Sequence, residues 1–370
     1  MEQSKKLKEA IKEYDKYWES FSGFHLQWHI TNQCNFRCKH CYQDNYQSNT
    51  LNFKKMELIF EDFLQIIQDK KKKFPDVQDS FSHLSITGGE PLLYNRFNDL
   101  MAKIAQKKKG FRLSIMSNGS LLTPLLLKKI FNDYQTDIIQ ISLEGAEKKN
   151  DEIRGKGSFT KAIRALENIK KMGEKAVISF TLNKQNLDDI PFLIKLAYDL
   201  DVKISIKRMV LQGSGKKMKK FFLSSDDLKR VYKYIDDINT NSKKNKDNFF
   251  VSLGCESGLA VQFNLKNQSA INFCSVMTSG VLTVLPDGTV YSCRRLPIKI
   301  GDLNHENLID IYQRVARGEY RIKMEKMPVG CQACEYFKYC FGGSRCVAFS
   351  HSLDKDLYAP DPQCPKLFSN

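Results

Sequence analysis

Three closely spaced cysteines are the first residues of this chain whose types and spacing point to chemistry. Cys34, Cys38 and Cys41 stand in the segment Cys-Asn-Phe-Arg-Cys-Lys-His-Cys, directly after a short apolar run. Gaps of three and two residues allow the three thiolates to meet at one small site. Three is one fewer than a closed tetrahedral zinc site or a cubane of four irons needs. The triplet therefore leaves two hypotheses open, an iron–sulfur cluster with an open iron and a zinc site completed by His40 or by a distant residue.

Eight further cysteines follow residue 250, which is enough for two four-thiolate metal sites. They are Cys255, Cys274, Cys293, Cys331, Cys334, Cys340, Cys346 and Cys364. Two residues separate Cys331 from Cys334, and five separate Cys334 from Cys340. The segment Pro-Asp-Gly-Thr-Val-Tyr-Ser-Cys, which ends at Cys293, predicts a β-hairpin that presents this thiol. Two structural zinc sites and two iron–sulfur clusters both fit the count.

The cysteine count, the N-terminal residues and the lack of a long apolar stretch indicate the cellular compartment of the chain. An odd total of eleven cysteines fits disulfide pairing badly. The N-terminal Met-Glu-Gln-Ser-Lys-Lys is charged where a signal peptide has an apolar run, so we expect a cytoplasmic protein with reduced thiols. No stretch approaches the roughly 18 consecutive apolar residues of a membrane span, so no membrane partner is expected.

Six short runs rich in β-branched and aliphatic residues predict the strands that position these motifs. They are His25–Ile30, His83–Thr87, Arg112–Ser117, Ile138–Leu143, Ala176–Leu182 and Val202–Lys207. Segments of helical period lie between them, as where Phe159, Ile163, Leu166 and Ile169 repeat every three or four residues. Alternating strands and helices predict an α/β fold with a parallel sheet. Six units are fewer than the eight of a closed barrel, so we expect a partial (β/α)6 TIM-like barrel.

At 370 residues the chain exceeds the roughly 250–300 residues that a single core holds, so we expect more than one domain. We predict an N-terminal helix within residues 1–23, the partial barrel at 24–222 and a bridging helix with a linker at 223–249. The polar segment Asn239–Asn248 is the expected linker. A small Cys-rich domain at 250–370 would be held together by its metal, since its apolar core is poor.

Polar motifs stand where the expected strands end, which is where a parallel barrel places ligand-binding residues. Thr-Gly-Gly-Glu-Pro occupies residues 87–91, Ser-Asn-Gly residues 117–119, and Ser-Leu-Glu-Gly residues 142–145. With the three-cysteine loop before them, and in this order, these motifs make residues 25–215 resemble the radical SAM superfamily. The resemblance implies that Cys34, Cys38 and Cys41 hold a [4Fe–4S] cluster whose fourth iron binds S-adenosylmethionine (SAM). Reductive cleavage of SAM would then give a 5′-deoxyadenosyl radical.

The same resemblance assigns residues to the methionine part of SAM. Gly88, Gly89 and Glu90 would bind its ammonium group, and Arg154 would pair with its carboxylate. The alternatives are a plain turn for the two glycines and a surface ion pair for Arg154.

Further residues are assigned by resemblance to the ribose and adenine of SAM. Asn118 and Ser142 would bind polar edges near the ribose, although Ser142 also fits a strand-end cap. His40 stands where the family often has an aromatic residue near the adenine. Glu144 receives no role, because the family often has Asp at that position.

The tail resembles the SPASM extension, which carries two auxiliary [4Fe–4S] clusters, so the expected total is three clusters. By position, the inner cluster would be bound by Cys255, Cys274, Cys293 and Cys346, and the outer one by Cys331, Cys334, Cys340 and Cys364. Five residues, Phe-Gly-Gly-Ser-Arg, separate Cys340 from Cys346, where the common gap is three. Because Cys255 is the most variable ligand of such domains, an inner cluster with an open iron is the alternative to full ligation by eight thiolates.

Members of this family with SPASM domains oxidise peptides or proteins, so we predict a maturase of a ribosomally made peptide that forms a thioether or other crosslink. Small-molecule cofactor biosynthesis and sulfatase-type protein maturation are alternatives. Arg294 and Arg295 stand where sulfatase-maturing relatives carry an aspartate, which disfavours the second. A zinc-stabilised binding module is the non-enzymatic alternative, and it predicts a colourless protein indifferent to oxygen.

The net charge of +16 bears on the partners. The lysine runs lack the interleaved aromatic residues that stack on bases, so no nucleic acid is expected. Solvated lysine-rich faces are the first interpretation of this charge, and an acidic flavodoxin or ferredoxin as reductant, or an acidic peptide, is the second. The 23 residues before the barrel are too few for a winged-helix leader-binding domain, so we expect a separate leader-binding protein or a surface of this chain to recognise the leader.

Overall fold

The computed structural model describes residues 23–47, 49–75, 78–245, 247, 249–254, 257–263, 265, 274, 276, 280–319 and 328–368. The chain forms two compact units, each assembled from three segments. Unit 1 comprises Met1–Asn35, Asn45–Gln140 and Ser275–Glu325, and unit 2 comprises Phe36–Asp44, Ile141–Cys274 and Lys326–Asn370. The expected N-terminal helix and Cys255 lie outside the described residues.

Unit 1 is built on parallel strands that alternate with helices. Strands β1 (His25–His29), β2 (His83–Thr87) and β3 (Arg112–Ser117) pair in sequence order, in the register His25 to His83 to Arg112. Strand β4 (Ile138–Ser142) comes next along the chain and contains the boundary between the units. The leucine and isoleucine side chains on these strands, except Ile138, are fully buried, which accounts for their apolar sequence.

Amphipathic helices bury their apolar stripes in unit 1. Helix α2 (Phe53–Lys73) begins where the Asn52 side chain accepts the backbone N–H of Lys55 at 2.9 Å. Apolar residues on one face of α2 are buried at intervals of one or three, as expected of a helix packed on a core. The other helices of the unit are α3 (Phe97–Gln106), α4 (Pro124–Lys128) and α9 (Leu308–Ala316).

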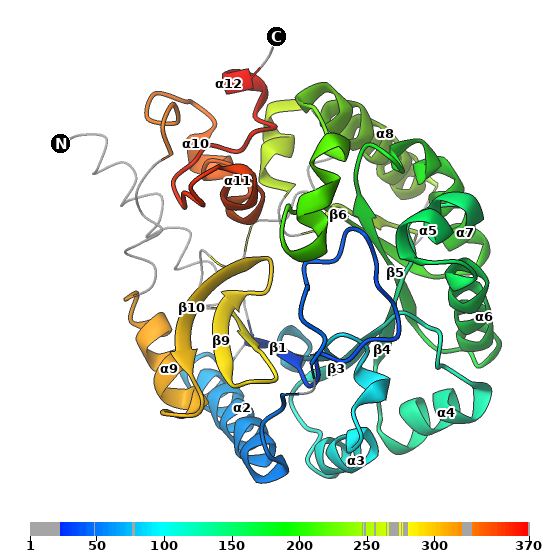
Figure 1. Ribbon diagram of the computed structural model, residues 1–370, viewed down its shortest axis with the longest axis vertical. Helices are drawn as coiled ribbons and strands as arrows, with labels where there is room; N and C mark the ends of the chain where they lie inside the picture. The colour runs from blue at the N-terminus through cyan, green and yellow to red at the C-terminus, as the bar shows by residue number, and fades with distance from the viewer. Residues whose placement is uncertain are drawn as a thin grey trace. The chain divides into compact units, whose positions relative to one another are not determined.

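The predicted hairpin before Cys293 is present in unit 1. Strands β8 (Val281–Val284) and β9 (Thr289–Cys293) are antiparallel, and Gly288 between them takes a positive φ of 90°. Strand β10 (Leu296–Asp302) pairs next to β9. Strand β8 also pairs in parallel with β1, a pairing the sequence did not predict, so the strand order of unit 1 is β10-β9-β8-β1-β2-β3. Figure 1 shows the hairpin in yellow.

Unit 2 repeats the alternation of strand and helix. Strands β5 (Ala176–Leu182) and β6 (Lys203–Arg208) are parallel over six residue pairs, and the short β7 (Val251–Ser252) extends the order to β5-β6-β7. Helices α5 (Glu147–Arg154) and α6 (Ser158–Lys171) precede β5, α7 (Ile190–Asp199) connects β5 to β6, and α8 (Ser225–Lys244) lies between β6 and β7. The six predicted strands are thus confirmed to within one residue at each end, and the α/β class is confirmed with them.

The expected linker Asn239–Asn248 is wrong over its first half, because α8 continues to Lys244. The side chain of Asn239 is buried and exchanges two hydrogen bonds with the backbone of Val251, at 3.0 and 2.9 Å. The polar composition of this segment does not indicate a linker, because Asn239 satisfies backbone groups of the short strand β7.

A buried ion pair anchors the C-terminal segment of unit 2 to the end of β6. Arg208 lies 3.0 Å from Asp361, and both side chains are at most 2% exposed. The segment contains α10 (Phe337–Cys340), α11 (Arg345–His351) and α12 (Pro365–Phe368), which are short helices around the last five cysteines. None of the helices in the described part of the chain has the length and apolar character that crossing a bilayer requires.

Candidate functional site

The Gly-Gly-Glu motif follows β2 and holds the start of the cysteine loop in unit 1. The backbone N–H groups of Gly89 and Glu90 donate to the carbonyls of Thr31 and Gln33 at 2.8 and 2.7 Å. A Cβ atom on Gly88 would lie 2.4 Å from the Thr31 oxygen, and one on Gly89 2.3 Å from the Gln33 oxygen. Both positions therefore require glycine because two backbone segments touch there. The glycines are more than a plain turn, since they fix the residues that lead to Cys34.

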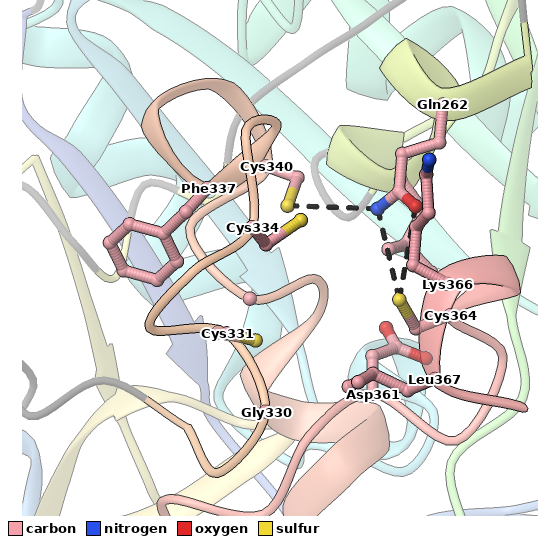
Figure 2. Close-up of a pocket in the computed structure, with 12 residues that line it drawn as sticks. Gln262, Gly330, Cys331, Cys334, Phe337, Cys340, Asp361, Cys364, Lys366 and Leu367 are labelled. Carbon is pink, nitrogen blue, oxygen red and sulfur yellow. Dashed lines mark hydrogen bonds between the residues drawn. The ribbon is translucent and has the colours of Figure 1, made fainter.

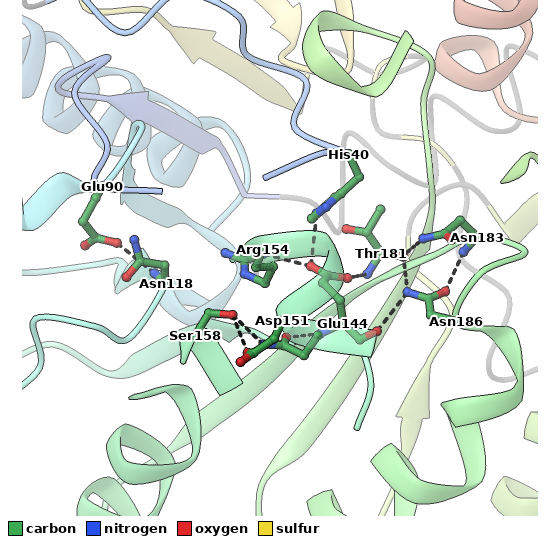
Figure 3. Close-up of polar contacts among 11 residues, drawn as sticks. His40, Glu90, Asn118, Glu144, Asp151, Arg154, Ser158, Thr181, Asn183 and Asn186 are labelled. Atoms are coloured by element: carbon green, nitrogen blue, oxygen red, sulfur yellow. Dashed lines mark hydrogen bonds and ion pairs between the residues drawn. The ribbon is translucent and has the colours of Figure 1, made fainter. Parts of the chain in front are cut away.

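Glu90 is a fully buried carboxylate at the end of β2. It accepts hydrogen bonds from the Ser117 hydroxyl at 2.9 Å and from the backbone N–H of Asn118 at 2.8 Å, as Figure 3 shows in part. The Asn118 side chain donates to Asn35 at 2.8 Å and accepts the N–H of Ser120 at 2.9 Å. The Ser117 hydroxyl and the Asn118 N–H are neutral donors, so they do not balance the charge of Glu90. A cation such as an ammonium group would stabilise this buried carboxylate further.

In unit 2, Glu144 follows β4 and joins two of the predicted site residues. Its carboxylate is 1% exposed and lies 2.9 Å from Arg154 Nη1 and 3.1 Å from His40 Nε2. The backbone N–H of Thr181 donates to the second oxygen at 2.8 Å (Figure 3). Burial alone would raise the pKa of Glu144, but His40, Arg154 and the Thr181 N–H outweigh burial and lower that pKa. Glu144, to which the sequence assigned no role, is therefore an ionised residue that orients both partners.

Arg154 is the last residue of α5, and the residues next to it end the helix. Gly155 takes a positive φ of 112°, and Asp151 accepts the N–H of Phe159 at 2.9 Å, which starts α6. Burial alone would lower the pKa of Arg154, but the thiolates of Cys38 and Cys41 and the carboxylate of Glu144 raise it. Arg154 does form an ion pair, with Glu144, but at 9% and 1% exposure the pair is buried and does not lie on the surface.

His40 and the second half of the cysteine loop are held within unit 2. The N–H of Lys39 donates to Ile153 at 2.9 Å, and the carbonyl of Cys41 accepts the N–H of Gly215 at 3.0 Å. His40 Nδ1 is buried and has no hydrogen-bond partner among the described residues, so it remains available to a ligand. Cys38 is buried, whereas Cys41 is half-buried.

Ser142 is the last residue of β4 and is half-buried. Its hydroxyl makes no hydrogen bond within the described part of the chain, so the strand-end cap gains no support. Because Cys34 belongs to unit 1 and the other cysteines of the triplet belong to unit 2, the structure describes two separate halves of the predicted SAM site.

Four cysteines of unit 2 line one small cavity, shown in Figure 2. They are Cys331, Cys334, Cys340 and Cys364, the four residues predicted to bind the outer cluster. The side-chain amide of Gln262 donates to the sulfurs of Cys340 and Cys364 at 3.9 and 3.8 Å. Burial raises the pKa of Cys331 to about 12 and that of Cys340 to about 11. Three of these cysteines are buried and Cys334 is half-buried. Four thiols around one cavity fit a four-thiolate cluster, whose binding would release their protons.

The four cysteines predicted for the inner cluster are divided between the two units and the residues outside the description. Cys274 is half-buried in unit 2, Cys293 ends β9 in unit 1, and Cys255 lies outside the description. Cys346 is buried on α11, and its sulfur lies 3.2 Å from the hydroxyl of Ser344. No group of three or more His, Cys, Asp or Glu residues in the described ranges is arranged to hold a single metal ion.

Comparison with known families decides between the hypotheses that the sequence left open. Residues 28–197 match the radical SAM superfamily, and residues 274–335 match SPASM, an iron–sulfur cluster-binding domain. The chain is a radical SAM protein with a SPASM domain. The non-enzymatic zinc module is therefore wrong, and the predicted family is confirmed.

Several curated relatives resemble this radical SAM protein over most of its length. The mycofactocin maturase MftC of Mycolicibacterium smegmatis is 28% identical over 356 residues, which cover 92% of this chain and 82% of the relative. The Fe-coproporphyrin III synthase of Methanosarcina barkeri is 32% identical over 206 residues, which cover 55% and 48%. The AdoMet-dependent heme synthase of the same organism is 23% identical over 353 residues, which cover 92% and 95%.

Solved structures confirm the fold of this radical SAM protein. A tagged form of anSMEcpe with bound AdoMet matches with a TM-score of 0.71 at 18% identity, over 93% of this chain and 91% of that one. Streptococcus suis SuiB bound to the precursor peptide SuiA matches with a TM-score of 0.70 at 19% identity, over 93% and 76%. The predicted partial barrel with a Cys-rich C-terminal extension is thereby confirmed.

Proposed function

We propose that this radical SAM enzyme oxidatively modifies a ribosomally made peptide and forms a thioether or other crosslink. The observation that carries the proposal is the similarity to mycofactocin maturase, which extends over 92% of this chain and includes both the barrel and the SPASM region. The fold shared with SuiB in its complex with a precursor peptide is consistent with it. The net charge of +16 suits an acidic peptide leader or an acidic reductant.

The residues of unit 1 would hold the ammonium end of SAM. Glu90 is a buried carboxylate that Ser117 and Asn118 orient, so it would pair with the methionine ammonium. Gly88 and Gly89 allow the Gly-Gly-Glu motif to lie against the loop that leads to Cys34. Asn118 uses one amide N–H on Asn35 and its oxygen on Ser120, which leaves the second N–H for a polar edge of SAM.

The residues of unit 2 would hold the carboxylate, ribose and adenine of SAM. Arg154 has several N–H groups and uses Nη1 on Glu144, so other N–H groups can bind a carboxylate. Ser142 would bind near the ribose through its unused hydroxyl, and His40 would face the adenine. Glu144 is a positioning residue that sets the orientation of Arg154 and His40.

Three [4Fe–4S] clusters complete the proposal. Cys34, Cys38 and Cys41 would hold the first, and when bound this cluster and SAM supply a 5′-deoxyadenosyl radical. In thioether formation one hydrogen atom leaves a peptide carbon for that radical, one proton leaves a cysteine thiol, and one electron leaves the peptide. The SPASM cysteines would hold the two clusters that can accept this electron. A flavodoxin or ferredoxin would reduce the first cluster, and a separate protein would present the leader, in the cytoplasm.

The test is the intact mass of the short peptide encoded beside the gene, after anaerobic incubation with reconstituted enzyme, SAM and reductant. The proposal predicts a loss of two hydrogens for each crosslink, and fragmentation locates the bond. A matched control is the Cys38→Ala variant, which should leave the mass unchanged and form no 5′-deoxyadenosine. An unchanged mass with the unmodified enzyme, despite 5′-deoxyadenosine formation, would contradict an oxidative crosslink.

A cofactor precursor is the second candidate substrate. It is favoured by the similarity to Fe-coproporphyrin III synthase and to AdoMet-dependent heme synthase. Incubation with iron-coproporphyrin III under the same conditions separates the two candidates, because only a porphyrin enzyme would alter the absorption and mass of the tetrapyrrole.

A further inference from the structure

Arg345, the first residue of α11, is a buried cation that no carboxylate among the described residues neutralises. Its side chain is 2% exposed, and its Nε and Nη1 atoms make no hydrogen bond within the described part of the chain. No carboxylate in the described ranges lies within ion-pair distance of it. The second buried arginine of this region, Arg208, differs in this respect, because Asp361 neutralises it at 3.0 Å. A buried, unneutralised guanidinium is among the costliest arrangements in a protein, so we expect beside it an anion that the described side chains do not supply.

The main groups that interact electrostatically with Arg345 are cysteine thiolates. Burial lowers the pKa of Arg345, and the thiolates of Cys331, Cys274 and Cys340 act in the opposite direction. Cys331 and Cys340 line the four-thiol cavity, to which the outer cluster is assigned. A [4Fe–4S] cluster with four thiolate ligands is a dianion when oxidised and gains one further negative charge on reduction. Such a cluster would supply the anion that Arg345 lacks.

The five residues between Cys340 and Cys346 explain how Arg345 reaches this position. Gly342 and Gly343 both take a φ of 81°, and the Gly343 N–H donates to the Cys340 carbonyl at 2.9 Å. A Cβ atom on Gly343 would lie 2.5 Å from the Cβ of Asp361, so the turn has no room for a side chain. The five residues of this unusually long gap thus include a glycine turn next to Cys340.

Asp361 then fixes the residue before Arg345. Its carboxylate, held by Arg208, accepts the backbone N–H of Ser344 at 2.8 Å. Arg345 is therefore placed by a chain of buried contacts that begins at the end of β6. None of these contacts uses its own guanidinium.

We propose that Arg345 is the built-in counter-ion of the outer auxiliary cluster and raises the reduction potential of that cluster, so that it accepts the electron released by the substrate. A fixed positive charge favours the more anionic, reduced state of a neighbouring cluster. Gln262, which donates to two sulfurs of the same cavity, acts in the same direction. The electron-accepting role rests on the proposed function, whereas the counter-ion role does not.

The test measures midpoint potentials by redox titration of the fully reconstituted protein with electron paramagnetic resonance detection. Arg345→Gln removes the charge and keeps N–H donors, whereas Arg345→Lys keeps the charge. We expect R345Q to shift one auxiliary midpoint to lower potential with the SAM-cluster midpoint unchanged, and R345K to stay close to the unmodified protein. Arg317→Gln, at an exposed arginine of unit 1, is the matched control and should shift nothing.

A second background assigns the effect to one cluster. In a Cys334→Ala chain, which should lack the outer cluster, R345Q is expected to shift no remaining midpoint. The proposal is overturned if R345Q carries all three clusters with unchanged midpoints, if the shift persists in the Cys334→Ala background, or if R345K loses the cluster as R345Q does. If R345Q alone fails to retain the outer cluster, judged by iron content, the charge is required for binding and the proposal stands. None of these readouts depends on a peptide substrate, so failure of the proposed function would be seen separately.

Discussion

The carboxylate of Glu144 lies 2.9 Å from the guanidinium of Arg154, and both side chains are buried within unit 2. The same carboxylate also lies 3.1 Å from His40. Two residues assigned to SAM by resemblance are therefore held by a third, which the sequence left without a role. The arrangement explains how an arginine at a helix end is kept in one orientation before a ligand binds.

Glu144→Gln is predicted to weaken SAM binding about tenfold, which corresponds to about 1.4 kcal/mol. The amide keeps the shape of the side chain but removes the charge that orients Arg154 and His40. Anaerobic equilibrium dialysis of SAM against the reconstituted variant measures the effect. Glu147→Gln, at an exposed position on α5, the helix that carries Arg154, is the control. Equal affinity of E144Q and the unmodified enzyme would show that Glu144 does not position Arg154.

Gly89→Ala is predicted to abolish SAM binding and to reduce cluster loading at the first site. A Cβ atom there would lie 2.3 Å from the Gln33 carbonyl oxygen, so the loop that leads to Cys34 has to shift. Iron content and SAM binding measure the loss. Gly173→Asn is the comparison, because Gly173 takes a φ of 72° with nothing within 4 Å of its Cβ position, and asparagine tolerates that conformation. A G89A protein that binds SAM normally would contradict the close approach.

If the chain holds the three proposed clusters, Cys346→Ala is predicted to lower the iron content from about twelve to about eight atoms per chain, because it removes the proposed ligand of the inner cluster. Ser344→Ala is predicted to leave the content unchanged, although its hydroxyl lies 3.2 Å from the Cys346 sulfur. Iron and protein assays on reconstituted samples measure both. The opposite outcome, loss of iron in S344A alone, would assign the ligand to Ser344.

His83 is predicted to make stability depend on pH. Burial, with a smaller contribution from Arg112, lowers its pKa from 6.5 to about 4 in the folded protein. The unfolded chain binds a proton between these two values and the folded protein does not, so the free energy of unfolding is highest above pH 6.5 and falls as the pH drops toward 4. The loss reaches about 2 kcal/mol at about pH 5.

The measurement is the Tm of the unmodified protein and of His83→Gln between about pH 7.5 and about pH 5, the range in which the histidine of the unfolded chain titrates. Glutamine can keep the hydrogen bond that His83 makes with Ser114 at 2.9 Å but does not titrate. The difference between the two Tm values should therefore change with pH, and the exposed His305→Gln should show no such change. Parallel pH profiles for H83Q and the unmodified protein would refute the assignment.

The strands of the barrel were predictable because each is a short apolar run bounded by turn residues, as in Arg112–Ser117, which the structure reproduces residue for residue. The pairing of β8 with β1 was not predictable from the sequence. It joins His25, near the start of the chain, to Val281 in its last third, and no local sequence pattern indicates a contact between segments so far apart. The role of Glu144 was missed for a similar reason, since its partners come from the cysteine loop, α5 and β5. The sequence did not indicate a role for Arg345, apart from its place in an unusually long gap between Cys340 and Cys346.

The most direct test of the central claim follows hydrogen from the peptide to the nucleoside. The adjacent short peptide, made with perdeuterated amino acids one type at a time, is incubated anaerobically with reconstituted enzyme, SAM and reductant. The account predicts that 5′-deoxyadenosine gains one deuterium when the reacting residue is labelled, while the peptide loses two hydrogen isotopes in the same proportion. Formation of 5′-deoxyadenosine that carries no deuterium with any labelled peptide, beside an unaltered peptide mass, would contradict a peptide-modifying radical enzyme.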